Sequence, residues 1–145
     1  MSPLKHLVVL GCAFWSLNSM AAESDVIGLW LSGDGDGWIE IRRDGDDVIG
    51  IIAGSPNNKE GDPPRLDDKN PDPELRGRVL DGVTIMKGFK YDGDDHWSGG
   101  TIYDPNSGNT YKGKLTLIET NTLKLRGYIG ISLFGRADTW TRTSK

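Results

Sequence analysis

The residues best suited to bind a polar ligand group lie between positions 54 and 82. Asn70, Asp72, Arg76 and Arg78 bring an amide, a carboxylate and two guanidinium groups into one short span. Guanidinium groups hold anionic oxygens through paired N–H donors, and amides both donate and accept hydrogen bonds. We therefore expect these four side chains to orient the polar or anionic head group of a small ligand.

Aromatic residues further along the chain form a second set of candidates. Side chains alternate between the two faces of a strand, so every second residue shares a face. Two such sets mix glycines with large side chains: Trp97, Gly99, Thr101 and Tyr103, then Tyr111, Gly113, Leu115 and Leu117. Glycines beside aromatic residues suit a tapered barrel interior with a cavity. We expect Trp97, Tyr103 and Tyr111 to line this cavity.

A third set is formed by Leu123, Leu125, Gly127 and Ile129, which share one face and leave Tyr128 on the other. The alternation does not decide which face is inner at the polar end of the barrel. Tyr128 is thus either ordinary exterior packing or a further aromatic contact to the ligand.

The residue types that histidine- or cysteine-based chemistry needs are nearly absent after residue 21. His96 is the only histidine there, and no cysteine follows Cys12. A hydrolytic triad needs a histidine, and zinc sites use several His or Cys ligands. Because His96 closes the turn that begins at Asp92, we expect it to lie in solvent. We expect no enzyme activity, no metal and no cofactor.

Oxygen ligands offer two weaker alternatives. The segments Asp34-x-Asp36 and Asp104-x-Asn106-x-Gly108 could supply oxygens to calcium, but the second lacks the terminal glutamate of an EF-hand. We interpret both as plain turn tips. A catalytic pair of carboxylates would require acids to converge. The acids concerned, which we expect to be solvated, are Asp67, Asp68, Asp72, Glu74 and Glu40.

Residues 1–21 have the layout of a cleavable signal peptide. Lys5 supplies a positive charge, residues 7–17 form an apolar run, and small residues precede Ala22. We expect cleavage after Ala21 or Ala22, which leaves a periplasmic or secreted domain over residues 22–145. The apolar run is shorter than the roughly 20 residues of a membrane-spanning helix, so no membrane span is expected.

A lipoprotein is the alternative, because Val9-Leu10-Gly11-Cys12 loosely matches a lipidation signal. Only residues 7–10 would then remain as the apolar segment, which is too short for export. Loss of the leader takes away Lys5, His6 and Cys12 and lowers the formal net charge from −4 to −5. Nucleic-acid binding needs a clustered basic surface, and the sequence contains no long Lys/Arg run. No nucleic-acid partner is expected.

Short strands separated by turn signals make up the rest of the chain. The expected strands cover residues 26–31, 38–43, 48–53, 83–90, 97–103, 110–117, 123–129 and 136–143. Asp-Gly pairs at 34–37, 44–45 and 92–93 suit tight hairpins, and short connections imply antiparallel neighbours. A coiled sheet of about eight strands can close on itself. We predict one all-β domain, an antiparallel up-and-down barrel.

The connection from 54 to 82 is too long for a hairpin. Asn70 as N-cap, Pro71 at the first helical position and acidic residues after it predict a short helical turn. Long connections inside compact domains are usually functional. We expect this loop to gate the barrel mouth.

Several motifs in order resemble the bacterial domain-of-unknown-function family 2147, a group of exported, lipocalin-like proteins. The motifs span nearly the whole mature chain. They are Gly28-Leu29-Trp30, Leu66–Pro73 with Leu75–Arg78, Gly99–Pro105 with Gly108 and Tyr111, Arg126–Gly130, and Phe134–Arg136 ahead of Trp140–Arg142. The resemblance implies a lipocalin or calycin-like barrel, and the family brings no established biochemical role.

The wider lipocalin resemblance rests on Gly28-x-Trp30, whose tryptophan would plug the closed barrel end beneath an arginine. Arg136 or Arg142 would be that arginine. Three features depart from lipocalins: a short first hairpin, no room for a helix after the last strand, and no cysteines for a disulfide. Any lid must then come from residues 54–82.

Residues 129–135 concentrate four large apolar side chains in an expected turn. Such a group must be covered, either by folding over one barrel end or by docking a protein partner or a second copy. The leading hypothesis is a barrel that binds a small, partly apolar ligand, lipid-like or amphipathic. The alternative is a cell-envelope interaction or inhibitor module that uses loop 54–82 or tip 129–135.

Overall fold

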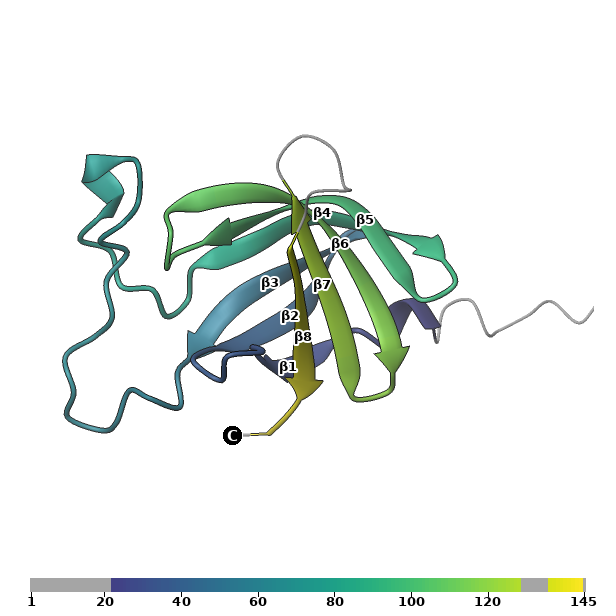
Figure 1. The fold of residues 1–145 in the computed structure, drawn as a ribbon, viewed down its shortest axis with the longest axis horizontal. Helices are drawn as coiled ribbons and strands as arrows, with labels where there is room; N and C mark the ends of the chain where they lie inside the picture. The colour runs from purple at the N-terminus through teal and green to yellow at the C-terminus, as the bar shows by residue number, and fades with distance from the viewer. Residues whose placement is uncertain (1–21, 129–135, 145) are drawn as a thin grey trace, which may run out of the picture.

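The computed structural model describes residues 22–128 and 136–144, which form a single closed antiparallel barrel (Figure 1). Each strand pairs with its neighbours in sequence, and β8 closes the barrel against β1. The strands are β1 (Gly28–Leu31), β2 (Trp38–Asp44), β3 (Asp47–Gly54), β4 (Thr84–Gly93), β5 (His96–Asp104), β6 (Asn109–Glu119), β7 (Thr122–Tyr128) and β8 (Arg136–Arg142). The expected barrel and its strand order are confirmed. None of the helical segments described is long and apolar enough to cross a membrane.

The expected signal peptide and the apolar tip at 129–135 lie outside the described residues. At the β4–β5 reversal the structure differs slightly from expectation, because strand structure continues to Gly93 and resumes at His96. The tight turn uses Asp94 and Asp95, with φ values of 51° and 60°. Aspartate tolerates this left-handed conformation because its short side chain can hydrogen-bond locally. His96 is exposed, as expected.

A β-bulge in β5 overturns the expectation that Trp97, Gly99, Thr101 and Tyr103 share one face. The register between β5 and β6 shifts between Trp97 and Gly100, where Gly99 has a φ of +78°. The extra residue exchanges the two faces beyond the bulge. Trp97 and Gly100 are therefore both buried, whereas Thr101 is exposed. Among the described residues the sets on β6 and β7 need no correction, since Leu115, Leu117, Leu123 and Leu125 are buried, while Ile129 lies outside the described residues.

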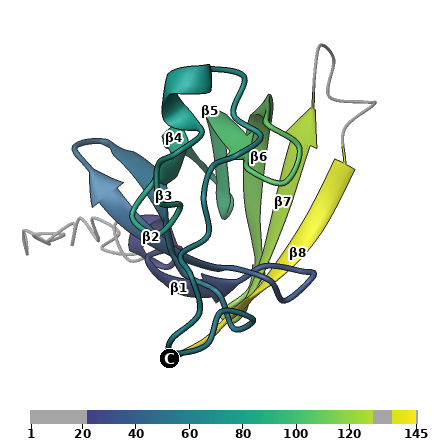
Figure 2. The ribbon, with the colours of Figure 1, turned by 90° about the vertical axis from the view of Figure 1, so that its left-hand side faces the viewer.

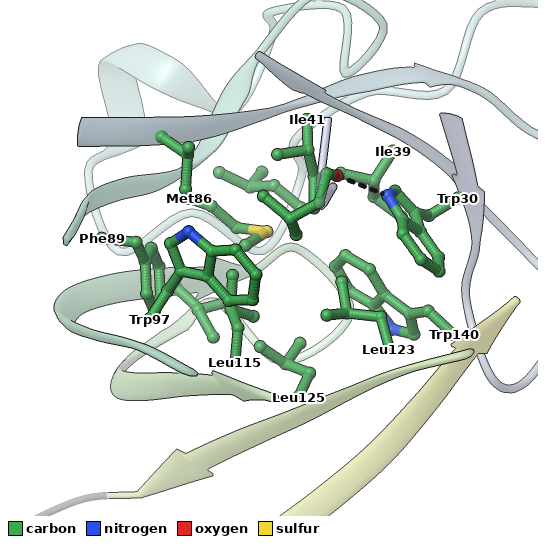
Figure 3. Packing of buried hydrophobic residues seen from close by; sticks show 14 of the residues in the cluster. Trp30, Ile39, Ile41, Met86, Phe89, Trp97, Leu115, Leu123, Leu125 and Trp140 are labelled. Carbon is green, nitrogen blue, oxygen red and sulfur yellow. Dashed lines mark hydrogen bonds between the residues drawn. The ribbon is translucent and has the colours of Figure 1, made fainter. Parts of the chain in front are cut away.

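The half of the barrel beside this bulge is filled rather than hollow. A Cβ atom built on Gly100 would lie 2.4 Å from the Phe89 ring, and one on Gly113 would lie 2.6 Å from Ile102 Cδ1. Phe89 has no exposed surface, and Figure 3 shows it beside Trp97 and Met86. The strand glycines therefore make room for large core side chains, not for a ligand.

Trp30 plugs the closed end of the barrel. Its side chain is fully buried and its Nε1 donates to Val26 O at 3.0 Å (Figure 3). The Arg142 guanidinium lies 4.4 Å from the centroid of the Trp30 ring. It also donates to Ile27 O at 2.8 Å and Thr120 O at 2.9 Å, and to Asp25 O. The arginine over the tryptophan is thus Arg142.

The up-and-down order assigns each connection to one end of the barrel. The β2–β3, β4–β5 and β6–β7 hairpins lie at the closed end near Trp30. The β1–β2 hairpin, the long loop between β3 and β4, and the β5–β6 hairpin lie at the other end, which Figure 2 faces. We call this end the mouth.

Gly113→Ala tests the filled interior. The added methyl group must displace Ile102 Cδ1, so we expect a loss of about 1–3 kcal/mol in the free energy of unfolding. Combining it with Ile102→Val, which removes that Cδ1 methyl, should recover part of the loss. Gly77→Ala is the control, because nothing lies within 4 Å of its added Cβ. Equal effects of the two alanines in urea denaturation would contradict the packing argument.

Candidate functional site

A half-open cavity of about 420 Å³ lies at the mouth of the barrel. Its inner wall is apolar and comes from the strands. This wall includes Ile39, Ile52, Ile85, Ile102, Leu125 and Trp140. Its outer part is built by the β1–β2 and β5–β6 hairpins, with Arg65 contributed by the long loop. The volume falls in the range of about 300–1,000 Å³ that is usual for small-molecule sites.

Carboxylates ring the rim of this cavity. Asp34 and Asp36 come from the β1–β2 hairpin, Asp104 from the end of β5 and Asp138 from β8. The two hairpins meet where Asn106 Nδ2 donates to Asp36 Oδ2 at 3.2 Å. Residues that the sequence indicated as separate turn tips therefore belong to one rim.

Asp34 and Asp36 influence one another's ionisation. Ser32 Oγ lies 2.7 Å from Asp34 Oδ1 and 3.0 Å from Asp36 Oδ1, so the two carboxyl groups share one hydroxyl. Partial burial and the neighbouring Asp34 carboxyl raise the pKa of Asp36. Burial also opposes the charge of Asp34, but hydrogen bonds from its surroundings outweigh it and leave the pKa of Asp34 lowered. The lowered pKa of Asp34 favours negative charge at the rim.

A buried carboxylate, Asp67, attaches the long loop to the barrel. Its side chain has no exposed surface. Tyr103 Oη donates to Asp67 Oδ1 at 2.5 Å, while Asn70 Nδ2 and Arg78 Nε donate to Oδ2 at 2.8 and 2.9 Å. Because Tyr103 also lines the cavity, this network joins the loop to the cavity wall.

These hydrogen bonds shift the pKa values of both Asp67 and Tyr103. Burial alone would raise the pKa of Asp67, but the bonds from Tyr103, Asn70 and Arg78, with the charge of Arg78, lower it overall. Burial, together with the hydrogen bond to Asp67 and its charge, raises the pKa of Tyr103 to about 12. Asp67 is therefore the anion of the network and Tyr103 a neutral donor.

A second contact holds the loop against the β5–β6 hairpin. Lys69 Nζ donates to Asn106 O at 2.9 Å. A Cβ atom on Gly108, where φ is +76°, would lie only 2.1 Å from Lys69 O, so a side chain there would separate the two segments. The loop thus rests on the hairpin that supplies Asn106 to the rim.

The short helical turn of the loop begins two residues later than expected. It is a 3₁₀ turn over Pro73–Leu75, capped by Asp72, whose side chain accepts from Glu74 N. Asn70 is not the N-cap, because its amide is engaged with Asp67 and its Oδ1 accepts from Asp72 N at 2.9 Å. A proline does occupy the first helical position, but it is Pro73 rather than the expected Pro71.

Two of the eight predicted ligand-binding residues, Tyr103 and Tyr111, line the cavity. The four loop residues do not: Asn70 and Arg78 bind Asp67, Asp72 caps the turn, and Arg76 Nε donates to Asn70 O at 2.7 Å. Among the remaining two, Trp97 is fully buried in the filled half of the core, 5.0 Å from the Tyr91 ring centroid. Tyr128 pairs with exposed Lys112 and so stands on the exterior face.

The five acids considered for a catalytic pair do not gather in one place. Glu40 lies on the barrel exterior, where it accepts from Arg42 at 2.8 Å. Asp67 is a buried residue of the long loop, and Asp72 caps the helical turn of that loop. The acids that do gather are those of the rim, and the sequence contained a signal for them. In an up-and-down barrel, alternate connections share an end, which places residues 34–36 and 104–106 together.

A family match covers most of the chain. The sequence model described as "Uncharacterized protein conserved in bacteria (DUF2147)" matches residues 28–142. The chain belongs to this family. The match begins at Gly28 on β1 and ends at Arg142 on β8, so it covers the whole barrel, the long loop and the arginine over Trp30.

A solved structure has the same fold. Protein HP1028 from Helicobacter pylori, described as belonging to the lipocalin family, superposes with a TM-score of 0.72 at 21% identity, over 81% of this chain and 82% of that chain. A redesigned β-barrel reaches a TM-score of 0.43 at 20% identity, over 85% and 96% of the two chains. No curated protein matches the sequence. The DUF2147 chain therefore has a lipocalin-like fold.

Asp67→Asn tests the loop attachment. A lowered pKa means that ionised Asp67 stabilises the fold above its unfolded pKa of about 3.9, and that this contribution is lost as pH falls through the lower folded value. The variant should lose about 2–3 kcal/mol at neutral pH and show a weaker decline in acid. Asp68→Asn, at an exposed neighbouring position, is the control. Denaturation curves with identical pH dependence for wild type and Asp67→Asn would contradict this role.

Proposed function

We propose that this DUF2147 protein binds a small, partly apolar ligand in the cavity at the barrel mouth. The observation that carries the proposal is the contrast between the two halves of the interior. Large side chains occupy the space beside Gly100 and Gly113, while about 420 Å³ stays open beside Ile85, Ile102 and Leu125. A core packed for stability alone would not leave an apolar space of this size.

The polar rim supports the same proposal. Ligand sites combine apolar walls with a few placed polar groups that orient the bound molecule. Here Ser32 and Asn106 hold the carboxylates of the β1–β2 hairpin at the opening. Tyr103 contributes its ring to the wall while its hydroxyl is held by Asp67. The lipocalin-like fold is compatible with this use of a barrel.

We propose binding rather than catalysis, by an exported domain. The proposal of export rests on the leader-like residues 1–21. Among the cavity residues that the structure describes there is no histidine or cysteine, and Arg76 and Arg78 are engaged within the loop. The role of the loop is then to brace the cavity wall through Tyr103.

Gly127→Phe tests the site directly. Gly127 lines the cavity, and its added Cβ would lie 3.4 Å from Tyr111 Cβ, so a phenyl group there fits into the open space. We expect wild type to bind the neutral fluorophore N-phenylnaphthylamine with a rise in emission, and Gly127→Phe to lose this binding. Tyr128→Phe, the adjacent exterior position, should bind as wild type does.

Native mass spectrometry of wild-type protein purified from its own envelope extends this test. We expect a chain that begins at Ala22 or Glu23 with a small molecule attached. Retained fluorophore binding in Gly127→Phe, or the absence of both dye and natural ligand in wild type, would count against the cavity as a binding site.

A second candidate function is protein interaction through the long loop. Leu66, Leu75 and Val79 are exposed by 44%, 36% and 45%. Leu66 and Val79 face one another across an isolated antiparallel bridge, so their side chains project to the same side. Exposed apolar groups on a loop held this firmly favour a docking role.

Leu66→Ser combined with Val79→Ser tests that second function. If the loop binds an envelope protein, this variant should lose the partner that wild type retains on a column. Ile118→Ser, which alters a 55% exposed apolar residue on β6, is the matched control. Equal recovery of the partner by all three proteins would exclude the loop as the docking surface.

A further inference from the structure

We propose that the ligand of the mouth cavity is an organic cation, an ammonium group attached to an apolar body. This inference rests on the proposed function, since it names the chemical class that the same cavity would take. The charges of the residues around the cavity indicate which class of ligand it favours.

The charge balance of the cavity lining is strongly negative. Asp34, Asp36, Asp104 and Asp138 contribute four carboxylates, whereas Arg65 is the sole cationic side chain among the lining residues described. Arg65 also has partners of its own, because its Nη2 lies 3.4 Å from Asp81 Oδ1 and 3.3 Å from Gly54 O. An anionic head group would meet four like charges at the opening, and a cation would meet opposite ones.

The side-chain donors to Asp34, Asp36 and Asp138 are neutral groups. Asp34 accepts from Ser32 Oγ at 2.7 Å, and Asp36 accepts from Asn106 Nδ2 at 3.2 Å. Asp138 accepts from Trp140 Nε1 at 2.8 Å. Neutral donors orient a carboxylate without cancelling its charge, so these contacts leave the negative field directed at the opening.

The walls favour an organic cation over a metal ion. Four aromatic side chains line the cavity, and aromatic faces attract ammonium groups while also packing against apolar groups. These residues are Trp38, Tyr103, Tyr111 and Trp140. The rim acids come from separate hairpins and strands, and among the described residues no three acidic, histidine or cysteine side chains stand close enough to hold a metal. An organic cation is larger than a metal ion, so its ammonium group can interact with carboxylates that lie apart while its apolar body reaches the inner wall.

The experiment compares three probes that share one apolar chain and differ in charge: octylammonium, octanol and octanoate. Binding is measured by isothermal titration calorimetry at neutral pH and low ionic strength, where charge effects are least screened. We expect octylammonium to bind at least about ten-fold more tightly than octanoate, with octanol between them.

The chain offers a matched pair of variants. Asp34-Gly35-Asp36 forms the hairpin tip at the mouth, and Asp44-Gly45-Asp46 has the same order of residues in the β2–β3 hairpin at the closed end. Asp34→Asn with Asp36→Asn should weaken octylammonium about ten-fold and leave octanol unchanged. Asp44→Asn with Asp46→Asn, which removes the same charge elsewhere, should bind as wild type does. Single Asp34→Asn serves if the double variant does not fold.

The outcomes separate the two proposals. Equal binding of all three probes, lost in Gly127→Phe, would overturn the cationic ligand and leave the cavity as a binding site. Failure of every probe would overturn both. Equal weakening of octylammonium by the two asparagine pairs would overturn the role of the rim, because net charge alone would explain it. Calcium that binds alone and displaces octylammonium would overturn the organic class in favour of a metal.

Discussion

The contact between Arg142 and Trp30 closes this barrel, and the rest of the structure depends on that closure. β1 and β8 pair only at Trp30 and Leu31, so theirs is the shortest strand pairing in the barrel. Arg142 strengthens it by stacking on Trp30 and by binding the Ile27 and Thr120 carbonyl groups. A guanidinium group suits this position because it can stack and donate in several directions at once.

Closure at one end allows the interior to be uneven. Near the β5 bulge, Phe89 and Ile102 take the space that Gly100 and Gly113 leave, so the barrel is solid there. Toward the mouth the inner wall stays apolar while the space between strands remains open. A rigid, well-packed half supports an open half, since the sheet is continuous around both and has no free edge.

The long loop acts on the cavity from outside. The sequence indicated a short helical turn in this segment, but it also suggested that loop side chains themselves contact a ligand. Instead, Asn70 and Arg78 satisfy the buried charge of Asp67, and Asp67 holds Tyr103. Burying a carboxylate is costly unless several donors compensate it. The polar residues of the loop are therefore used for attachment, and the charge at the mouth comes from the hairpins.

Much of the fold follows from local sequence, because alternation, Asp-Gly turns and short connections each depend on neighbouring residues alone. These patterns predicted about eight strands, their order and the barrel, and the resemblance of Gly28-x-Trp30 to lipocalins indicated the closed end. They could not predict that Gly100 and Ile102 rather than Gly99 and Thr101 are buried, since one bulged residue at Gly99 reverses the alternation beyond it.

The meeting of the rim residues depends on the topology of the barrel rather than on any local pattern. Asp36 and Asn106 lie far apart in the chain and are joined only when the barrel closes and brings alternate hairpins to one end. Likewise, the choice of Arg142 over Arg136 depends on which residue lies across from Trp30 in the β1–β8 register. The sequence by itself determined the barrel and its turns. Tertiary structure decided what lies inside, because register and closure bring together residues that no local pattern connects.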